Sequence, residues 1–325
     1  MQMIKVELKD IDEIKEIFLS YPFKNFQQQF QNIDKNTLST FLAKNLTNTL
    51  NDINYENYFI PQKALLTINK DKWHSSIYNI NMAKISNLVL MENNESIYPL
   101  IYEQIDNFVR KNSIQHLSCR LDISDFDNIQ FLQQNGFYYV GESIKMCLKV
   151  EGDRRVSSVP LNPKWNFEIV DYKPEHKNNI KQIARTAHNK NYFFFDPNLD
   201  KQKTAILFEK WTERCIDSLA EKVFVAMKNK TVVGFLIYLI NKKLNDALNK
   251  KIAILDFMAI DESCKGMKIG SGLLAHFIND IKDKYEMIEL RTMNNNFPAI
   301  NLYQKFGFLI ISSDLIFHKY IKSIN

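Results

Sequence analysis

Three of the eight glycines in this 325-residue chain lie in one segment, CKGMKIGSGLLAHF, from Cys264 to Phe277. The segment connects a strand-like run to a run whose apolar residues recur at helical spacing. Backbone N–H groups at the start of a helix lack partners within the helix and lie at the positive end of its dipole, so such a turn attracts anions. Neither the Walker pattern nor the dinucleotide-binding fingerprint is met. A tight strand-to-helix turn is therefore an equally simple explanation of the glycines.

A second segment, NFPAINLYQKFGF, follows the first and narrows its interpretation. Together they resemble the two signature segments of the GCN5-related N-acetyltransferase (GNAT) superfamily. The family's cofactor loop, Arg/Gln-x-x-Gly-x-Gly/Ala before a helix, corresponds here to Lys265 through Gly270. Its later segment, Asn-x-x-Ala-x-x-x-Tyr-x-x-x-Gly-Phe, is met in full by Asn296, Ala299, Tyr303, Gly307 and Phe308. The resemblance covers the chain from about Phe224 to Phe308.

The resemblance implies that loop amides from Met267 to Ser271 hold the pyrophosphate of acetyl-CoA, the co-substrate, and that no metal takes part. The pantetheine would run along the strand that ends at Ile260, and a backbone N–H near Met258 would polarise the thioester carbonyl. Lys268 departs from the pattern because it replaces the first loop glycine, where a residue with a side chain must either adopt an unstrained backbone or accept a strained one. The implied cofactor-binding residues are Met258, Ile260, Lys265, Gly266, Met267, Lys268, Ile269, Gly270, Ser271 and Asn296.

The resemblance also implies that Tyr303 is the acid that protonates the leaving thiolate. A phenol with a pKa of about 10 can donate to the thiolate of a thiol with a pKa of about 8.5. Core packing is the alternative, because Tyr303 lies on an apolar helical stripe. Asp256 is the carboxylate nearest in sequence to the expected thioester, and strand alternation predicts that it shares a face with Met258. It would accept the proton of the amine, although a solvated strand end explains it equally well.

The acceptor site is expected in the least regular part of the second half, Arg185 to Ser218. An aromatic run there precedes Asp196 and Pro197, and a helix with Trp211 follows. These features are similar to the dTDP-fucosamine acetyltransferases, which N-acetylate a dTDP-linked 4-amino-4,6-dideoxygalactose. That resemblance implies substrate contacts from Tyr192, Phe193, Asp196 and Trp211.

Tyr192 departs from that second pattern, in which an arginine precedes the aromatic residue. An aromatic floor can stack on a base or a sugar face, and Lys190 would meet the diphosphate. His188 would assist proton transfer, although a lone histidine is more often structural. A hydrophobic loop capped by Asp196 before a core helix is the structural alternative.

The two halves of the chain look like an internal duplication. LSCRLDISDFDNIQFLQQNGFYYV and ELRTMNNNFPAINLYQKFGFLII both read as strand, helix, Gly-Phe turn and strand. At an offset of 171 residues, six of the nineteen positions from Cys119 to Phe137 are identical. The identical pairs are Arg120 and Arg291, Phe126 and Phe297, Ile129 and Ile300, Gln133 and Gln304, Gly136 and Gly307, and Phe137 and Phe308.

We therefore expect an α+β fold with tandem GNAT-like domains. Each would contain a mixed, mostly antiparallel sheet flanked by helices, and the second would contain a V-shaped splay between two parallel strands. The expected domains are 1–150, degenerate and without the cofactor loop, and 167–325, catalytic. The segment 151–166, polar and with two prolines, reads as a linker between them.

Composition restricts the remaining possibilities. The net charge of +5 is spread along the chain without a dense basic run, which argues against nucleic acid as a partner. No run approaches the ~18 apolar residues of a membrane span. The four cysteines, Cys119, Cys147, Cys215 and Cys264, form no CxxC pair, so neither a zinc site nor a disulfide framework is indicated. A reduced cytoplasmic protein is expected, with a homodimer possible.

The predicted function is acetyl-CoA-dependent N-acetyl transfer to the primary amine of a small molecule, a nucleotide-linked amino sugar of the dTDP-4-amino-4,6-dideoxyhexose type. A protein or peptide N-acetyltransferase is the first alternative. A non-catalytic acyl-CoA-binding protein is the second, and the intact Tyr303 argues against it for the second half. Aminoacyl-tRNA-dependent transfer is disfavoured by the CoA loop.

Overall fold

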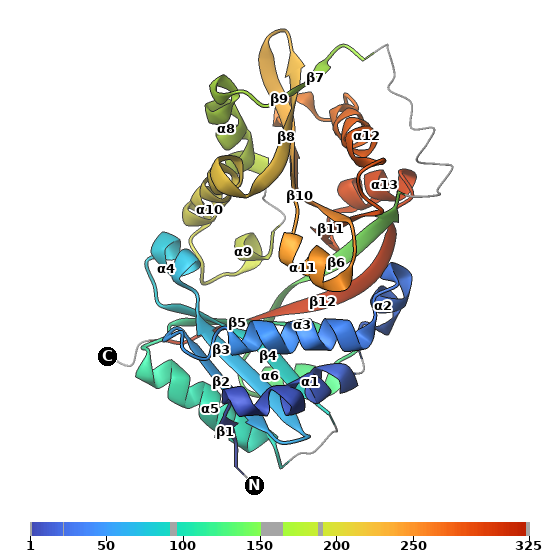
Figure 1. The fold of residues 1–325 in the computed structure, drawn as a ribbon. Helices are drawn as coiled ribbons and strands as arrows, with labels where there is room; N and C mark the ends of the chain where they lie inside the picture. The colour runs from blue at the N-terminus through green and yellow to red at the C-terminus, as the bar shows by residue number, and fades with distance from the viewer. Residues whose placement is uncertain (1, 22, 92–95, 151–164, 188–190, 323–325) are drawn as a thin grey trace. The chain divides into compact units, whose positions relative to one another are not determined.

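The computed structural model describes residues 2–21, 23–91, 96–150, 165–187 and 191–322. The chain divides into two compact units (Figure 1), both α+β as predicted. Unit 1 comprises Met1–Glu142 and Ser312–Asn325, and unit 2 comprises Ser143–Ile311. Most of the expected linker, 151–164, lies outside the described residues. None of the helices in the described ranges combines the length and apolar composition needed to cross a bilayer.

Unit 1 contains a mixed sheet in the order β1-β2-β3-β4-β5-β12. The pair β4 and β5 is parallel and the other neighbours are antiparallel. The strands are β1 (Ile4–Lys5), β2 (Tyr55–Ile60), β3 (Ala64–Lys70), β4 (Met82–Leu90), β5 (His116–Asp122) and the later part of β12 (Leu309–Tyr320).

Helices cover both faces of the unit 1 sheet. Ile14 of α1 (Ile11–Ser20) and Ala43 of α3 (Lys35–Thr47) belong to one buried cluster. Ile101 of α5 (Tyr98–Lys111) and Phe131 of α6 (Phe126–Gln134) belong to another. The shorter helices are η1 (Leu8–Asp10), α2 (Asn25–Gln31) and α4 (Lys72–Tyr78).

Unit 2 repeats this plan with strands in the order β6-β11-β10-β9-β8-β7. Asn229 and Lys230 join β8 to β9 with φ of 50° and 65°, and two positive φ values are typical of the hairpin turn that matches strand twist. Among the described strand pairs of unit 2, only β10 and β11 are parallel. The strands are β6 (Tyr138–Lys149), β7 (Glu168–Asp171), β8 (Ala220–Lys228), β9 (Thr231–Leu239), β10 (Ile252–Ile260) and β11 (Met287–Met293).

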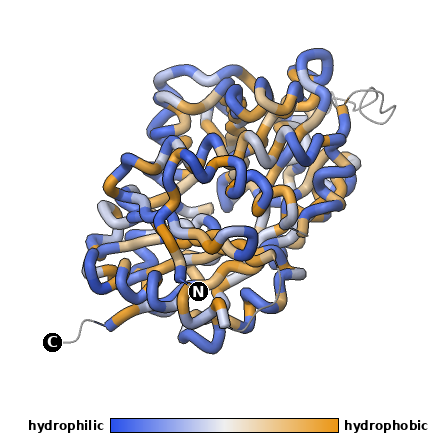
Figure 2. The backbone as a smooth tube through the Cα atoms, turned by 60° about the horizontal axis from the view of Figure 1, so that its bottom comes forward, coloured by the Kyte–Doolittle hydropathy of each residue, from blue (hydrophilic) through white to orange (hydrophobic). Residues whose placement is uncertain are grey.

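The helices of unit 2 also lie on both faces of its sheet (Figure 1). α8 (Lys177–Ala187) and α10 (Lys201–Arg214) pack on one face, and α12 (Ile269–Ile281) and α13 (Phe297–Lys305) on the other. Figure 2 shows hydrophobic residues concentrated along the strands and hydrophilic residues at the turns. The remaining elements are η2 (Pro174–His176), α9 (Tyr192–Phe195), η3 (Cys215–Leu219), α11 (Lys242–Leu248) and η4 (Glu262–Cys264).

The structure confirms the internal repeat. β5, α6 and β6 have the bounds of β11, α13 and β12 shifted by the offset of 171 residues read from the sequence. Gly136 and Gly307 both have a positive φ, 78° and 90°, in the turn that follows the helix. Glycine adopts this backbone without a steric penalty, which explains why the Gly-Phe turn occurs in both halves.

The last strand of each half pairs within the unit built mainly from the other half. Asp314 to Tyr320 of β12 pair with β5 of unit 1, and Ser143 to Lys149 of β6 pair with β11 of unit 2. The expected boundaries at 150 and 167 therefore differ from those of the compact units. The reason is physical: a strand belongs to the sheet that satisfies its backbone hydrogen bonds, whatever its place in the chain.

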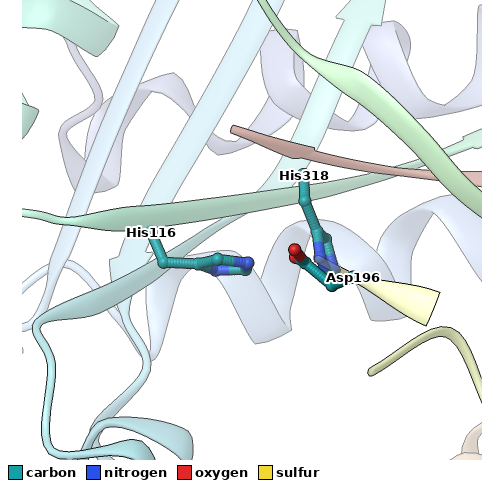
Figure 3. Close-up of side chains that lie close together, drawn as sticks. All are labelled: His116, Asp196 and His318. Atoms are coloured by element: carbon teal, nitrogen blue, oxygen red, sulfur yellow. The ribbon is translucent and has the colours of Figure 1, made fainter. Parts of the chain in front are cut away.

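Both exchanged strands are deeply buried in their host units. His318 of β12 and His116 of β5 are fully buried, with ring centroids 4.4 Å apart (Figure 3, which also labels Asp196, a residue of unit 2). In unit 2, the exchanged segment contributes Ile144, Met146, Leu148 and Val150 to the core.

A fragment that starts at residue 167 should therefore fail to fold. It lacks four buried side chains, each contributing about 1.5–3 kcal/mol, which together approach the whole stability of a typical domain. We expect no cooperative thermal transition by circular dichroism for residues 167–325. Residues 143–311, which include the β6 segment, should melt cooperatively. Equal melting temperatures for the two fragments would contradict this role of β6.

Candidate functional site

The parallel strands β10 and β11 separate part-way along their length. Their ladder runs from Ile252–Met287 to Leu255–Leu290, and both strands continue beyond it. β10 remains paired with β9 as far as Ile260, and β11 remains paired with β6 as far as Met293. Past Leu255, the side of β10 that faced β11 therefore has no strand partner within the described ranges. This is the V-shaped opening that the resemblance to the GNAT superfamily implies.

A bulge lies in β10 where the opening begins. The register with β9 shifts between Leu255 and Phe257, so Asp256 has no partner in that ladder. One extra residue reverses the alternation of side chains along a strand. Leu255 and Met258 accordingly pack on the α12 side, whereas Phe257 packs on the side of α8 and α10.

The bulge overturns one prediction about Asp256. Simple alternation predicts that it shares a face with Met258, but its carboxylate lies on the side of α10. Asp256 Oδ2 accepts hydrogen bonds from Trp211 Nε1 at 2.9 Å and from Cys215 Sγ at 3.6 Å. Two residues of the expected site, Asp256 and Trp211, are therefore in direct contact.

The environment of Asp256 increases the proton affinity of its carboxyl group. Burial raises the pKa of this carboxyl above its ordinary value, and the hydrogen bonds from Trp211 and Cys215 offset part of the rise. Burial and the neighbouring carboxylate also raise the pKa of the Cys215 thiol, which keeps it a neutral donor. Cys215 begins a π-helical turn after α10, an irregularity frequent at functional sites.

The glycine-rich segment forms the start of α12 as predicted. The first hydrogen bond of this helix runs from Gly272 N to Lys268 O at 3.0 Å. The amides from Lys268 to Ser271 donate to no backbone carbonyl among the described residues, which leaves them available to an anion. The amide of Met267 is engaged, because it donates to Cys264 O at 3.4 Å.

Two of the glycines lie where a side chain would be tightly packed. A Cβ on Gly270 would lie 3.1 Å from Ile260 Cδ1 and 3.3 Å from Leu302 Cδ2. A Cβ on Gly272 would lie 2.7 Å from Phe167 Cε2, closer than real Cβ contacts. Gly270 thus allows the first turn of α12 to approach the end of β10, where Met258 and Ile260 lie, and Gly272 allows it to approach Phe167.

Two lysines of the segment, Lys265 and Lys268, and one beside it, Lys228, carry positive charge near the start of α12. Lys268, the N-cap residue of α12, has φ of 62° and ψ of 15°, so it adopts the left-handed backbone favoured by glycine. Lys265 forms an exposed ion pair with Glu262 at 2.5 Å. Gly266, the next residue, has a positive φ of 83°. Lys228, at the end of β8, lies with its Nζ 3.3 Å from Met267 Sδ.

Tyr303 lies on α13 and is 6% exposed. Its ring packs against Phe308 at a centroid distance of 5.7 Å. Burial raises the pKa of its phenol, so the hydroxyl stays protonated over the whole physiological range. Asn296, the residue before α13, donates from Nδ2 to Thr292 Oγ1 at 3.2 Å and does not cap the helix with its side chain.

Of the predicted acceptor residues, Trp211 contacts the candidate base, and the others lie in or next to α9. Trp211 contacts Asp256, as described. Asp196 is fully buried and accepts a hydrogen bond from Asn198 N at 2.8 Å, which places it in a local turn. Tyr192 and Phe193 of α9 have ring centroids 4.4 Å apart, with Phe193 buried. His188 and Lys190 lie outside the described residues.

Comparison with known proteins identifies a domain within unit 2. Residues 183–308 match the model of the Acetyltransferase (GNAT) family. The match includes the bulge at Asp256, the start of α12 and Tyr303. Unit 2 contains a GNAT acetyltransferase domain.

Relatives extend the similarity beyond the matched residues. "Spore coat polysaccharide biosynthesis protein SpsD" from Bacillus subtilis is 24% identical over 258 residues, 79% of this chain and 83% of that protein. A tandem GNAT protein from the clavulanic acid biosynthesis pathway has a TM-score of 0.61 at 10% identity and covers 100% of this chain and 99% of its own. A GCN5-related N-acetyltransferase from Sphaerobacter thermophilus has a TM-score of 0.63 at 11% identity, covering 98% and 95%. The tandem fold predicted from the repeat is confirmed.

Two residues of the GNAT domain join the site without a sequence signal strong enough to predict them. Cys215 follows Trp211 by four residues on a helical pattern, but only the bulge brings a carboxylate to that face. Lys228 precedes a hairpin turn, and only the folded sheet places it beside the α12 segment.

Lys268→Gly should stabilise the GNAT domain by about 0.5–1 kcal/mol. The substitution removes the left-handed strain of a residue with a Cβ, although glycine also increases the entropy of the unfolded chain. Chemical denaturation would measure the free energy of unfolding. Lys268→Gln is the matched control, since it removes the charge but retains the strain, and it should show no gain. A stabilisation shared by both variants would attribute the effect to charge.

Proposed function

We propose that unit 2 transfers the acetyl group of acetyl-CoA to a primary amine of a small molecule. The observation that supports this proposal is that the start of α12 and the carboxylate of Asp256 lie on opposite faces of β10. The first turn of α12, with its available amides, packs against Met258 and Ile260 on one face. The carboxylate of Asp256 lies with α10 on the other face. A cofactor and an acceptor that approach the opened strand from opposite sides would meet at the gap.

The residues around α12 fit the pyrophosphate of CoA. The amides from Lys268 to Ser271 are oriented by the helix and supported by its dipole. The ammonium groups of Lys228 and Lys268 add positive charge in the same region. Acetyl-CoA would supply an activated acetyl thioester, so the protein itself needs only to orient the groups and to move protons.

Asp256 and Tyr303 have suitable proton affinities for the two transfers. Asp256, with a raised pKa, would accept a proton from the attacking amine, and Trp211 would hold its carboxylate in place. Tyr303, protonated throughout the working range, would donate its proton to the departing thiolate.

The acceptor that these surroundings favour is a nucleotide-linked amino sugar. The indole of Trp211 lies beside the candidate base, and α9 adds the neighbouring rings of Tyr192 and Phe193 in the same unit. Aromatic faces suit the apolar face of a sugar or a nucleobase. A relative named for polysaccharide biosynthesis, SpsD, supports a sugar over a peptide.

An acceptor panel tests this function directly. The full-length protein with acetyl-CoA would be assayed for free thiol against dTDP-linked amino sugars, polyamines and lysine-containing peptides. We expect release of CoA with the nucleotide amino sugars, and none with the matched nucleotide sugars that carry a hydroxyl in place of the amine. Acetylation of peptides alone would overturn the sugar assignment, and thiol release from none of the amines would overturn amine acetylation.

The pH dependence of kcat/KM should identify the base. A base works deprotonated, so the rate should fall as the pH falls through the raised pKa of Asp256, above the ordinary carboxyl value of about 3.9. Trp211→Phe removes a donor that stabilises the carboxylate, so this acidic limb should move to higher pH.

Tyr303→Phe is the matched control for that profile. It should lower kcat by about 10²-fold or more at every pH without moving the acidic limb. Asp256→Asn should abolish the limb and lower the rate. An unchanged profile in Asp256→Asn would assign proton removal to solvent.

A further inference from the structure

Unit 1 contains a cavity of about 260 Å³ where its own parallel strands separate. The ladder between β4 and β5 runs from Met82–His116 to Ile85–Cys119, and both strands continue beyond it. The volume lies just below the range of about 300–1,000 Å³ that is usual for drug-sized ligands, so the cavity suits a small metabolite. The side chains that matter below are Tyr21, Lys24, Lys35, Ser86, Arg120 and Asp122, all of which line it.

The cavity occupies the place in unit 1 that the candidate acceptor side occupies in unit 2. The register of β3 with β4 shifts between Thr67 and Ile68, which leaves Ser86 unpaired, as Asp256 is in β10. Ser86 donates a hydrogen bond to Asn69 Oδ1. The bulge and the separated strands are therefore present in both units, but unit 1 has no carboxylate at the bulge and no glycine between β4 and α5.

Negative charge is concentrated at one end of this cavity. Asp122 is 6% exposed, and its Oδ1 accepts a hydrogen bond from Ser124 N at 2.9 Å. Its Oδ2 accepts none from the described residues. Asp314 lies directly opposite Asp122 in the β5–β12 ladder and is also buried, an arrangement of like charges that is unfavourable without a counter-charge. Asp125, a third buried carboxylate, accepts a hydrogen bond from Tyr21 Oη at 3.2 Å.

Lys24 forms an ion pair with one of these three carboxylates. Lys24 Nζ lies 3.2 Å from Asp314 Oδ1, and Lys24 has φ of 67°, a left-handed backbone that is uncommon for a residue with a Cβ. The negative charge also affects Tyr21. Burial is the largest cause that raises the pKa of its phenol, and the neighbouring carboxylates raise it further. Because Asp122 lines the cavity and its Oδ2 accepts no hydrogen bond from the described residues, this oxygen is available to a donor or a cation from outside.

The rim of the cavity has the opposite charge. Arg120 and Lys35 are both exposed and line the opening. Lys35 donates to Asn25 Oδ1 at 2.6 Å, whereas the guanidinium of Arg120 forms no ion pair or hydrogen bond within the described part of unit 1. A guanidinium with free donors is suited to bind a phosphate in a bidentate fashion.

We propose that unit 1 binds a small phosphorylated amine in this cavity, with the ammonium group on Asp122 and the phosphate on Arg120 and Lys35. The site binds without transferring an acyl group, because unit 1 lacks the glycine-rich segment. Its occupancy does not depend on the acetyl transfer proposed for unit 2.

Isothermal titration of the full-length protein, without acetyl-CoA, tests the proposal with three matched probes. Glucosamine 6-phosphate carries both groups, glucose 6-phosphate lacks the amine, and glucosamine lacks the phosphate. We expect glucosamine 6-phosphate to bind about tenfold or more tightly than either of the others, because each of those loses a charge-assisted contact. Equal binding of glucose 6-phosphate would overturn the role of the carboxylate, and equal binding of glucosamine would overturn that of the rim.

Substitutions locate the binding in unit 1. Asp122→Asn should weaken glucosamine 6-phosphate about tenfold or more while the melting temperature stays equal or rises, since one of three clustered charges is removed. Arg120→Gln, an exposed substitution, should erase the preference for the phosphorylated amine. Asp256→Asn should leave this binding unchanged, which separates the site from the acceptor site of unit 2. Binding that is lost in Asp256→Asn but kept in Asp122→Asn would refute a site in unit 1.

Discussion

The end of the ladder between β10 and β11 is the constraint on which the candidate site depends. Four pairs hold the strands together, and beyond Leu255 β10 follows β9 while β11 follows β6. Each separated strand keeps one partner, so only one edge of each is left unsatisfied. An opening of this kind offers backbone polar groups and access from both faces of the sheet. The bulge at Asp256 lies at its base and decides which side chains face which ligand.

The exchange of strands explains why this opening is compatible with a stable sheet. β11 would become an edge strand beside the gap if β6 did not pair with its other side from Ser143 to Lys149. That pairing also brings Ile144, Met146 and Leu148 into the core beneath α12 and α13. The first half of the chain, which has no glycine-rich segment, thus supplies a strand that the GNAT domain needs. The first half of the chain therefore has a structural role in the GNAT domain, whether or not it binds a ligand.

Local signals in the sequence were sufficient for the repeat and for the start of α12. The Gly-Phe turns and the helix stripes depend on nearby residues, so the offset of 171 reproduces the bounds of three elements. The face of Asp256 could not be predicted, because a bulge adds one residue to the pairing without altering the hydrophobic pattern around it. The partners of β6 and β12 could not be predicted either. A strand with two buried faces reads the same in either sheet, and only the long-range pairing decides between them.

Both units contain a β-bulge next to separating parallel strands, but the side chains at the two bulges differ. In unit 2 the bulge presents a carboxylate, Asp256, on the α10 side. In unit 1 the bulge presents Ser86, and the buried carboxylate with an available oxygen is instead Asp122, at the end of the neighbouring strand β5. Across the β5–β12 ladder Asp122 lies opposite a like charge at Asp314, which pairs with Lys24, whereas Asp122 Oδ2 remains open to the cavity. Moving the acid by one strand therefore changes its proposed role, from a base that accepts the proton of an amine to a group that pairs with a positive charge.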